Sequence, residues 1–233
     1  MEAYIVDAIR TPIGKFNGTL SSIRPDDLAA FVIKKIVERN SFWLDANEIE
    51  EVVLGAANQS GEDNRNVARM ALLLAGLPVK IGGVTVNRLC ASGLQAIMDA
   101  SRAIMCGDGE LFIACGVESM TRAPFVMPKA ESAFSRSNAV YDTTIGWRFT
   151  NPKINSRFGA HSMPETADNV AGDYHIARPD QDAFALRSQA RWAKAQAAGY
   201  FKDEIAAITL PQKKGDPLVI SSDEHPRPET TLA

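Results

Sequence analysis

The sequence is short of the features that mark membrane, disulfide-stabilised and nucleic-acid-binding proteins. It has no apolar run long enough to cross a bilayer, and its opening residues, MEAYIVDAIR, lack the pattern of a signal peptide. Only three cysteines occur in 233 residues, with no Cys-x-x-Cys pair. Lys and Arg number 25 against 28 Asp and Glu, a net charge of −3 that argues against bulk attraction to nucleic acid or to an anionic membrane. We therefore expect a cytoplasmic globular protein with reduced thiols, and neither nucleic acid nor a membrane as a partner.

Several common catalytic signatures are also missing. The sequence has no HExxH metal motif, no GxSxG nucleophile elbow, no P-loop and no GxGxxG dinucleotide fingerprint. The three cysteines, Cys90, Cys106 and Cys115, are 16 and 9 residues apart with no histidine nearby, a spacing that does not suit zinc. We therefore expect no metal site, and hydrolytic-elbow, NTPase and dinucleotide-binding functions lose support.

What the sequence does contain is an alternation of short apolar runs and amphipathic stretches. The predicted strands are at residues 4–9, 51–55, 84–86 and 111–114. Between them lie predicted helices, the first capped by Asp26 or Asp27 and the others at residues 66–75 and 90–105. We expect the strand at residues 4–9 to be buried. The alternation predicts an α/β fold with a largely parallel sheet covered by helices.

The second half of the chain follows a different pattern. Residues 121–162 lack sustained periodicity, as long functional loops do. Helices are predicted beyond this segment at residues 165–174 and 179–198, and short strands at residues 205–210 and 218–220.

In the first half, the helix at residues 90–105 has few polar positions around its circumference, which implies burial on nearly all sides.

Cys90 is the residue whose surroundings point most directly to chemistry. It follows a β-branched strand and precedes an apolar helix, in a turn of small residues. A thiol at a helix N-terminus faces unsatisfied backbone N–H groups and the positive end of the helix dipole, which favour the thiolate. The same turn brings the sulfur and the backbone N–H of Cys90 together as nucleophile and oxyanion donor. Because cysteines in α/β proteins are usually small buried hydrophobes, Cys106 and Cys115, which lack this setting, are expected to be structural.

Three histidines in the second half are the candidates for a base that activates this thiol. His175 is expected at a helix end, where a capping role is the simplest account. His161 lies near the start of a helix and suits either a pocket lining or a surface loop. Neither of them, nor His225, lies in a base motif.

The residues around Cys90 resemble those of a known family. The stretches NRLCASGL at residues 87–94 and GVESMTRAP at residues 116–124 look like the N-terminal half of a thiolase. Four more segments fit that family in order: DAIRTPIG at residues 7–14, GEDNRNVAR at 61–69, PETADNV at 164–170 and DQDAFALRS at 180–188. Within the family, the stretches ANQSGEDNRNVARMALLLAGLP, DTTIGWRF and DEHPRPETTL are most similar to the 3-oxoadipyl-CoA thiolases of aromatic-compound degradation.

The resemblance implies a thiolase-like layered α/β fold, with a mostly parallel mixed sheet and a buried nucleophile helix, together with an α+β loop domain. In family terms residues 1–118 form the N-terminal sheet domain, and residues 119–233 form an incomplete loop domain that binds coenzyme A. The C-terminal thiolase domain is absent, and the family places there the histidine and second cysteine that move protons. Without it, the helix at residues 90–105 is expected to be exposed on one side, which predicts poor solubility, dimerisation or a missing partner chain.

The resemblance also implies a two-step acyl transfer. Cys90 attacks the 3-keto carbonyl of a 3-oxoacyl-CoA, acetyl-CoA leaves, and CoA releases the shortened acyl group from the cysteine. By resemblance, the backbone N–H of Cys90 forms part of an oxyanion hole, Met163 lines the acyl and pantetheine pocket, and Arg227 lies near the CoA nucleotide. Coenzyme A is thus a substrate, no cofactor is tightly bound, and a homodimer or homotetramer is expected. Many biosynthetic thiolases have His where this sequence has Ser162, which agrees with a degradative subfamily.

Other functions stay open at the level of sequence. One is thiolysis of acetoacetyl-CoA or of a fatty-acid 3-ketoacyl-CoA. Another is a non-catalytic CoA-binding or interaction module without the C-terminal half. A ketosynthase-type condensing enzyme shares the fold and a cysteine nucleophile, although its motif around the cysteine differs.

Overall fold

The computed structural model describes residues 2–232, which its contacts group into two units. The first unit holds the residues up to Pro124 together with Asp203–Glu224, and the second holds Phe125–Lys202 together with the residues from His225 onward. Each unit is described by itself below. The division of the chain at residue 118 that the family resemblance implies stays a prediction.

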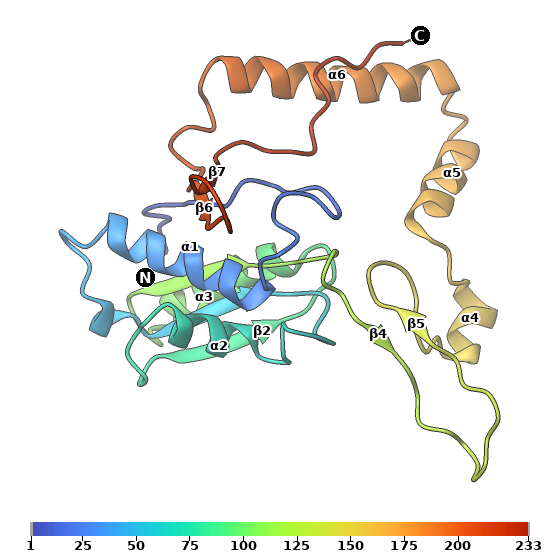
Figure 1. The fold of residues 1–233 in the computed structure, drawn as a ribbon, viewed down its shortest axis with the longest axis horizontal. Coiled ribbons are helices and arrows are strands. Elements are labelled where there is room, and N and C mark those ends of the chain that lie inside the picture. Colours follow the sequence, from blue (N-terminus) through green and yellow to red (C-terminus); the bar gives the residue numbers. More distant parts are fainter. Residues whose placement is uncertain (1, 233) are drawn as a thin grey trace. The chain divides into compact units, whose positions relative to one another are not determined.

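A parallel three-stranded sheet forms the centre of the first unit (Figure 1). β1 (Glu51–Gly55) lies between β2 (Gly82–Val86) and β3 (Phe112–Gly116). Gly55 is in register with Val86 on one side and with Gly116 on the other, so all three strands end at the same edge. The predicted α/β fold with a largely parallel sheet is confirmed.

Helices cover both faces of this sheet because the side chains of β1 alternate. Val52 and Leu54 point into a cluster with α1 (Pro25–Arg39) and α2 (Val67–Leu74), while Val53 points to α3 (Ser92–Cys106). Full burial of a side chain of this size stabilises the fold by roughly 1.5–3 kcal/mol. These alternating valines and leucines therefore fix both the register of β1 and the faces that the helices occupy.

The start of α1 differs from its prediction. The N-cap is Arg24, with Pro25 at the first helical position, and neither Asp26 nor Asp27 caps the helix. Asp26 is instead buried in the first turn, where the Arg24 guanidinium donates to both of its carboxylate oxygens at 2.9 and 2.8 Å. Proline suits this first position because its missing N–H would have no helical partner there.

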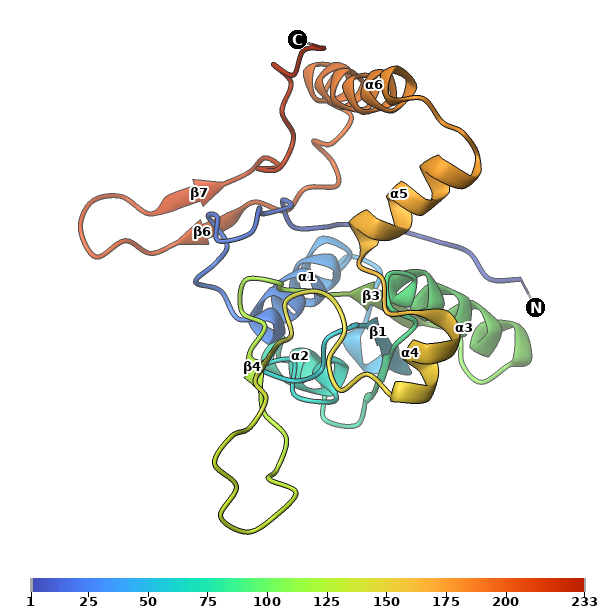
Figure 2. The ribbon, with the colours of Figure 1, turned by 90° about the vertical axis from the view of Figure 1, so that its right-hand side faces the viewer.

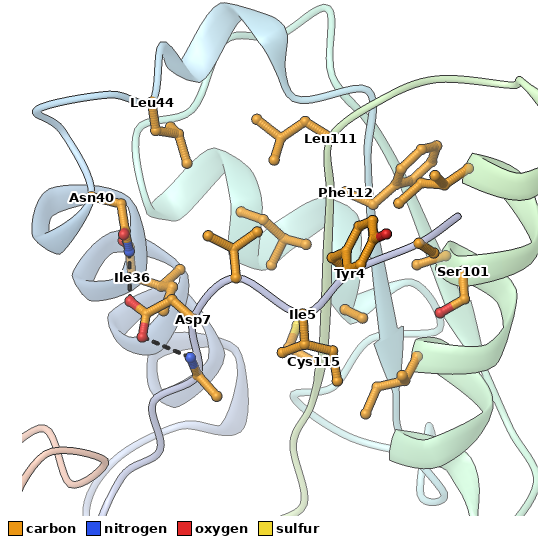
Figure 3. Close-up of a pocket in the computed structure, with 18 of the residues that line it drawn as sticks. Tyr4, Ile5, Asp7, Ile36, Asn40, Leu44, Ser101, Leu111, Phe112 and Cys115 are labelled. Atoms are coloured by element: carbon orange, nitrogen blue, oxygen red, sulfur yellow. Dashed lines mark hydrogen bonds between the residues drawn. The ribbon is translucent and has the colours of Figure 1, made fainter. Parts of the chain in front are cut away.

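Residues 4–9 do not form the buried strand that the sequence predicts. Tyr4, Ile5 and Val6 are 74%, 79% and 68% exposed, and the segment makes no strand ladder. It runs past β3 with an apolar cavity of about 320 Å³ between them, lined also by side chains of α1 and α3 (Figure 3). Asp7 explains the position, since its carboxylate accepts hydrogen bonds from Arg39 and from Asn40, the latter at 2.6 Å. The segment is thus extended, as its residues favour, but held toward the end of α1 rather than at the edge of β3.

The burial predicted for the nucleophile helix on nearly all sides is also wrong for this chain. In α3 only Ser92, Ala96 and Ala100 are buried. Leu94 and Met105 are 61% and 59% exposed. The helix therefore packs on the sheet through one face, which is the one-sided exposure that the family resemblance implies.

The predicted helices and strands beyond residue 162 agree with the structure to within a few residues. In the first unit, β6 (Ile208–Leu210) and β7 (Leu218–Ile220) form an antiparallel hairpin (Figure 2). The second unit contains the short strands β4 (Phe125–Val126) and β5 (Tyr141–Asp142), followed by α4 (Pro152–Phe158), α5 (Met163–Asp173) and α6 (Arg178–Ala197). Of these, β4, β5 and α4 lie within residues 121–162, where no element was predicted. No helix in the described part of the chain combines the length and apolar character that a membrane span requires.

Candidate active site

Cys90 lies in the turn that joins β2 to α3, at the edge of the sheet where the parallel strands end. Its side chain is exposed. The helix begins two residues later, at Ser92, with Ala91 as its N-cap. The carboxyl ends of parallel strands are the usual place for ligand sites in α/β proteins, because the loops that leave the strands converge there. The predicted location of Cys90, immediately before a helix, is confirmed.

Two glycines let this turn approach the sheet. A Cβ atom at Gly55 would lie 2.3 Å from the carbonyl carbon of Ser92. At Gly116, a Cβ atom would lie 3.3 Å from the carbonyl oxygen of Gly55 and 3.6 Å from the Cα atom of Gly93. The first helical turn of α3 therefore packs directly on the backbone of β1, and this contact sets the height of Cys90 above the sheet.

The residue before the nucleophile has an unusual backbone conformation. Leu89 has a φ of 49°, in the left-handed region that branched side chains seldom occupy. Its N–H donates to Asn87 Oδ1 at 2.9 Å, and its carbonyl oxygen accepts from Ser92 through both the N–H, at 3.0 Å, and Oγ, at 2.6 Å. Such conformations persist where surrounding contacts over-determine them, as these hydrogen bonds do.

Polar contacts also link the loops that follow the three strands. Glu118, after β3, accepts hydrogen bonds from the N–H groups of Ala57, at 2.9 Å, and Asn58, at 3.3 Å, both after β1. Asn87, after β2, donates from Nδ2 to the carbonyl oxygen of Ala57 at 2.9 Å. No role was predicted from the sequence for Asn87, Ser92 or Glu118, although all three lie within the two stretches that resemble thiolases. Short polar side chains that flank a nucleophile were the available signal, because such side chains often bond to nearby backbone.

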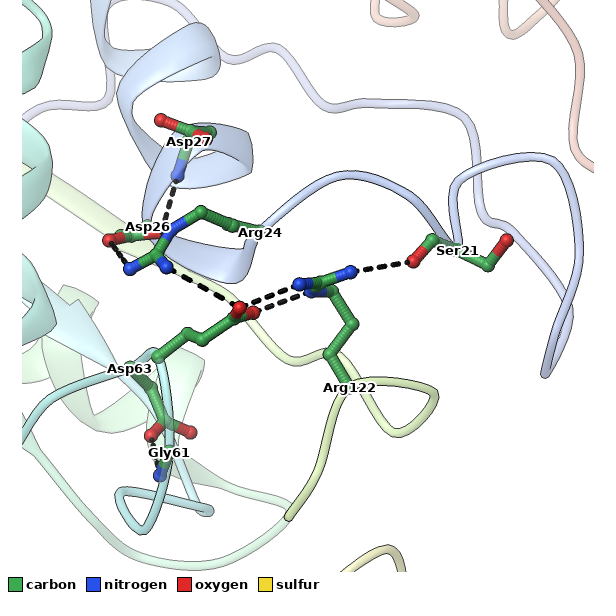
Figure 4. Close-up of polar contacts among 8 residues, drawn as sticks. Ser21, Arg24, Asp26, Asp27, Gly61, Asp63 and Arg122 are labelled. Atoms are coloured by element: carbon green, nitrogen blue, oxygen red, sulfur yellow. Dashed lines mark hydrogen bonds and ion pairs between the residues drawn. The ribbon is translucent and has the colours of Figure 1, made fainter.

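An ion pair adds a second link between two of these loops (Figure 4). Arg122, after β3, donates to both carboxylate oxygens of Glu62, after β1, with an Nη2 to Oε1 distance of 2.6 Å, and to the carbonyl oxygen of Ser21 at 3.3 Å. The hydrogen bond from Arg122 holds the pKa of Glu62 below its ordinary value, against the opposing effect of burial. The stabilisation is therefore present at neutral pH and is lost as the pH falls through that lowered pKa.

Cys115 in β3 has a different environment from Cys90. Its partly buried side chain packs against the cluster formed by α1, α2 and β1 and lines the apolar cavity beside residues 4–9. Burial raises the pKa of the Cys115 thiol to about 12. The thiol therefore has almost no thiolate at neutral pH, and this packing supports the structural role expected from the sequence.

The thiols should accordingly differ in reactivity toward iodoacetamide. At pH 8 we expect the exposed Cys90 and Cys106 to be alkylated, while Cys115 stays unmodified in the folded chain because only about one thiol in ten thousand is ionised there. Peptide mapping by mass spectrometry measures all three. Unfolding in urea should expose Cys115 and serves as the positive control. Rapid alkylation of Cys115 in the folded chain would contradict the burial described above.

Met163 and Arg227 belong to the second unit, whereas Cys90 belongs to the first. Met163 is the first residue of α5, and its exposed side chain lines a shallow groove along that helix with Val170 and Ile176. Arg227 is exposed, and its N–H donates to Gln189 Oε1 at 2.7 Å. Their predicted contacts with the acyl chain, pantetheine and CoA nucleotide stay predictions.

Two histidines of the second unit, His161 and His175, have local structural contacts. His175 has a φ of 53° just after α5, and its N–H donates to the carbonyl oxygen of Gly172 at 3.2 Å, which confirms a place at the helix end. The carbonyl oxygen of His161 accepts from Trp147 Nε1 at 3.2 Å. In the described part of the chain, no group of three or more His, Cys, Asp or Glu side chains is arranged to hold a metal ion.

The chain is similar to known proteins over nearly its whole length. The family described as thiolase, N-terminal domain, matches residues 3–233. A beta-ketoadipyl-CoA thiolase of Pseudomonas aeruginosa is 62% identical over 231 residues, which cover 99% of this chain and 57% of that protein. A 3-oxoadipyl-CoA/3-oxo-5,6-dehydrosuberyl-CoA thiolase of Escherichia coli K12 is 61% identical, with the same coverage of both.

A solved structure supports the same relationship. The acetyl-CoA acetyltransferase of Bacillus anthracis matches with a TM-score of 0.83 and 36% sequence identity, over 96% of this chain and 54% of that one. The chain therefore spans a little more than half the length of the proteins that it matches.

Proposed function

Because the chain belongs to the thiolase family, of which it matches the N-terminal domain, we propose that the full-length protein is an acyltransferase that cleaves 3-oxoadipyl-CoA with CoA. The products are acetyl-CoA and a shortened acyl-CoA. The observation that carries the proposal is Cys90, exposed in a turn before α3 at the carboxyl edge of the sheet. The substrate is supported by relatives about 61% identical that are named for 3-oxoadipyl-CoA or beta-ketoadipyl-CoA. We propose that this reaction serves the degradation of aromatic compounds by the beta-ketoadipate route, which the names of these relatives support.

In the first half-reaction, Cys90 Sγ forms a bond to the C3 carbonyl carbon of the substrate. The bond between C2 and C3 then breaks, the electron pair goes to C2, and protonation there releases acetyl-CoA. In the second, the CoA thiol attacks the thioester and releases the Cys90 thiolate. The backbone N–H of Cys90 lies next to the attacking sulfur, where it can donate to the carbonyl oxygen as negative charge develops.

The second unit is proposed to bind the rest of the substrate. The apolar groove of α5 begins at Met163 and suits contact with an acyl or pantetheine chain. Arg227 supplies an exposed guanidinium for the CoA nucleotide, a group for which planar multidentate donors are well suited. We further propose a homodimer or homotetramer and a reducing cytoplasmic setting, which the three free thiols favour.

The substrate is tested by a thiolysis assay on the full-length protein. We expect kcat/KM for 3-oxoadipyl-CoA to exceed that for acetoacetyl-CoA by at least tenfold. CoA is saturating in both reactions, so the difference in kcat/KM reports only on the acyl chain of the substrate. Equal efficiency with the two substrates would defeat the subfamily assignment.

The 233-residue chain alone is expected to be nearly inactive. The resemblance places the proton-transferring histidine and second cysteine of the family beyond these residues, and a nucleophile without its base loses most of its rate. A single-turnover reaction with 3-oxoadipyl-CoA in the absence of free CoA measures this directly. Rapid acylation of Cys90 by this chain at neutral pH would show that the missing groups are not required.

A further inference from the structure

Asn87 joins the nucleophile turn to the loop that follows β1. Its Nδ2 donates to the carbonyl oxygen of Ala57 at 2.9 Å, and its Oδ1 accepts from the N–H of Leu89 at 2.9 Å. Both partners are backbone groups, one able only to accept and the other only to donate, so they fix the orientation of the Asn87 amide. One side chain thereby connects two strand-end loops three residues before Cys90.

Leu89 is the part of the turn that most needs such support. Its left-handed conformation, with a φ of 49°, is unfavourable for residues other than glycine. Asn87 holds its N–H, and Ser92 holds its carbonyl oxygen from the other side. Because the dihedral angles of Leu89 set the direction in which the chain enters Cys90, these bonds also set the direction of the thiol and of the Cys90 N–H.

Glu118 fixes the anchor to which Asn87 is attached. Its carboxylate accepts from the N–H of Ala57 at 2.9 Å, while Asn87 bonds the carbonyl oxygen of the same residue at 2.9 Å. Both backbone groups of Ala57 are therefore held by side chains from the other two strand-end loops. A hydrogen bond to a charged carboxylate is stronger than one between neutral groups. We therefore expect the bond to Glu118 to fix the position of Ala57 more strongly than the bond to Asn87 does.

We propose that Asn87 and Glu118 are positioning residues for Cys90, acting through the connection Glu118 to Ala57 to Asn87 to Leu89. The inference rests on the proposed function, because it concerns the orientation of the nucleophile in that reaction. Neither side chain touches the reacting atoms. Their effect is to hold Sγ and the Cys90 N–H in the directions that attack and oxyanion binding require, since a displacement of about 1 Å can cost on the order of a hundredfold in rate.

The test compares Asn87→Ala, Glu118→Ala and the double variant in the full-length protein. We expect each single variant to slow acylation of Cys90 by 3-oxoadipyl-CoA, measured in the absence of free CoA, by roughly 30- to 100-fold. Alkylation of Cys90 by iodoacetamide, which tolerates many directions of approach, should change by less than about threefold. Because both residues act through one connection, the double variant should be no more than about threefold slower than the slower single variant.

Asn66→Ala is the matched control. Asn66, just before α2, likewise links two segments through a backbone group, because its Nδ2 donates to the carbonyl oxygen of Gly83 in β2 at 3.0 Å. Its side chain also caps α2. Its loss should lower the Tm at least as much as that of Asn87 and leave acylation within about twofold. Acylation of Asn87→Ala at the wild-type rate, or a double variant in which the two losses multiply, overturns the inference alone. A wild-type protein that is not acylated contradicts the proposed function instead, and the inference with it.

Discussion

Replacement of Cys90 by serine in the full-length protein is expected to lower kcat for thiolysis of 3-oxoadipyl-CoA by about a thousandfold or more. The hydroxyl of serine has a far higher pKa than a thiol, so the oxygen is far less ionised at neutral pH and is a much weaker nucleophile toward the 3-keto carbonyl. Since Cys90 is exposed, the Tm should change by less than about 1 °C. Steady-state kinetics and thermal unfolding on the same preparation measure both quantities.

Cys106 provides the control for that experiment. It is a second exposed thiol, at the last residue of α3, and has no place in the proposed reaction. Cys106→Ser should retain full activity. Loss of activity in Cys106→Ser, or full activity in Cys90→Ser, would show that a residue other than Cys90 is the nucleophile.

The largest effect on stability is expected from Gly55→Ala. The added Cβ would lie 2.3 Å from the carbonyl carbon of Ser92 and 2.5 Å from the N atom of Gly93. Both are backbone atoms of α3, which cannot rotate away as a side chain could, so the helix must move off β1. We expect a loss of about 3 kcal/mol in the free energy of unfolding, at the upper end for an overpacked methyl group, and slower acylation of Cys90. Urea unfolding measures the free energy of unfolding, and the single-turnover reaction measures the rate of Cys90 acylation.

Gly93→Ala is the matched change on the other side of the contact. A Cβ at Gly93 meets nothing within 4 Å, and alanine in a helix is favoured over glycine by up to about 1 kcal/mol. This variant should therefore be as stable as the wild type or more so. Equal stability of Gly55→Ala and Gly93→Ala would contradict the close approach of α3 to β1.

The elements best predicted from sequence are those whose information is local. The helix predicted at residues 66–75 is α2, whose first turn is capped by Asn66 through a hydrogen bond from the N–H of Arg69 and which Gly76, with a φ of 80°, follows. Likewise, β1 was predicted with its observed bounds, Glu51–Gly55, from a short apolar run. Periodicity and end signals sufficed for these elements.

The prediction for residues 4–9 failed because a strand needs a partner. The apolar and β-branched residues Tyr4, Ile5 and Val6 favour an extended backbone, and the segment is extended. Whether it joins a sheet depends on contacts such as those of Asp7 with Arg39 and Asn40, more than 30 residues away in the sequence. For α3, the sequence similarly shows that most of the helix surface is apolar. It does not show which residues pack against that surface.

The candidate site divides in the same way. Cys90 could be predicted because its setting is a continuous stretch of sequence, from a strand through a turn of small residues to a helix. Asn87 and Glu118 could not, because Asn87 meets Ala57 across 30 residues of sequence and Glu118 meets it across 61. Only the parallel sheet, which gathers the three strand ends at one edge, brings these loops together.

The most direct test of the account is a search for the acyl-enzyme itself. The full-length protein is mixed with 3-oxoadipyl-CoA in the absence of free CoA, quenched in acid, digested and mapped by mass spectrometry. The account predicts one succinyl group, on Cys90, that is lost when CoA is added before the quench. A succinyl group on a different residue, or turnover by an enzyme whose Cys90 never carries one, would contradict it.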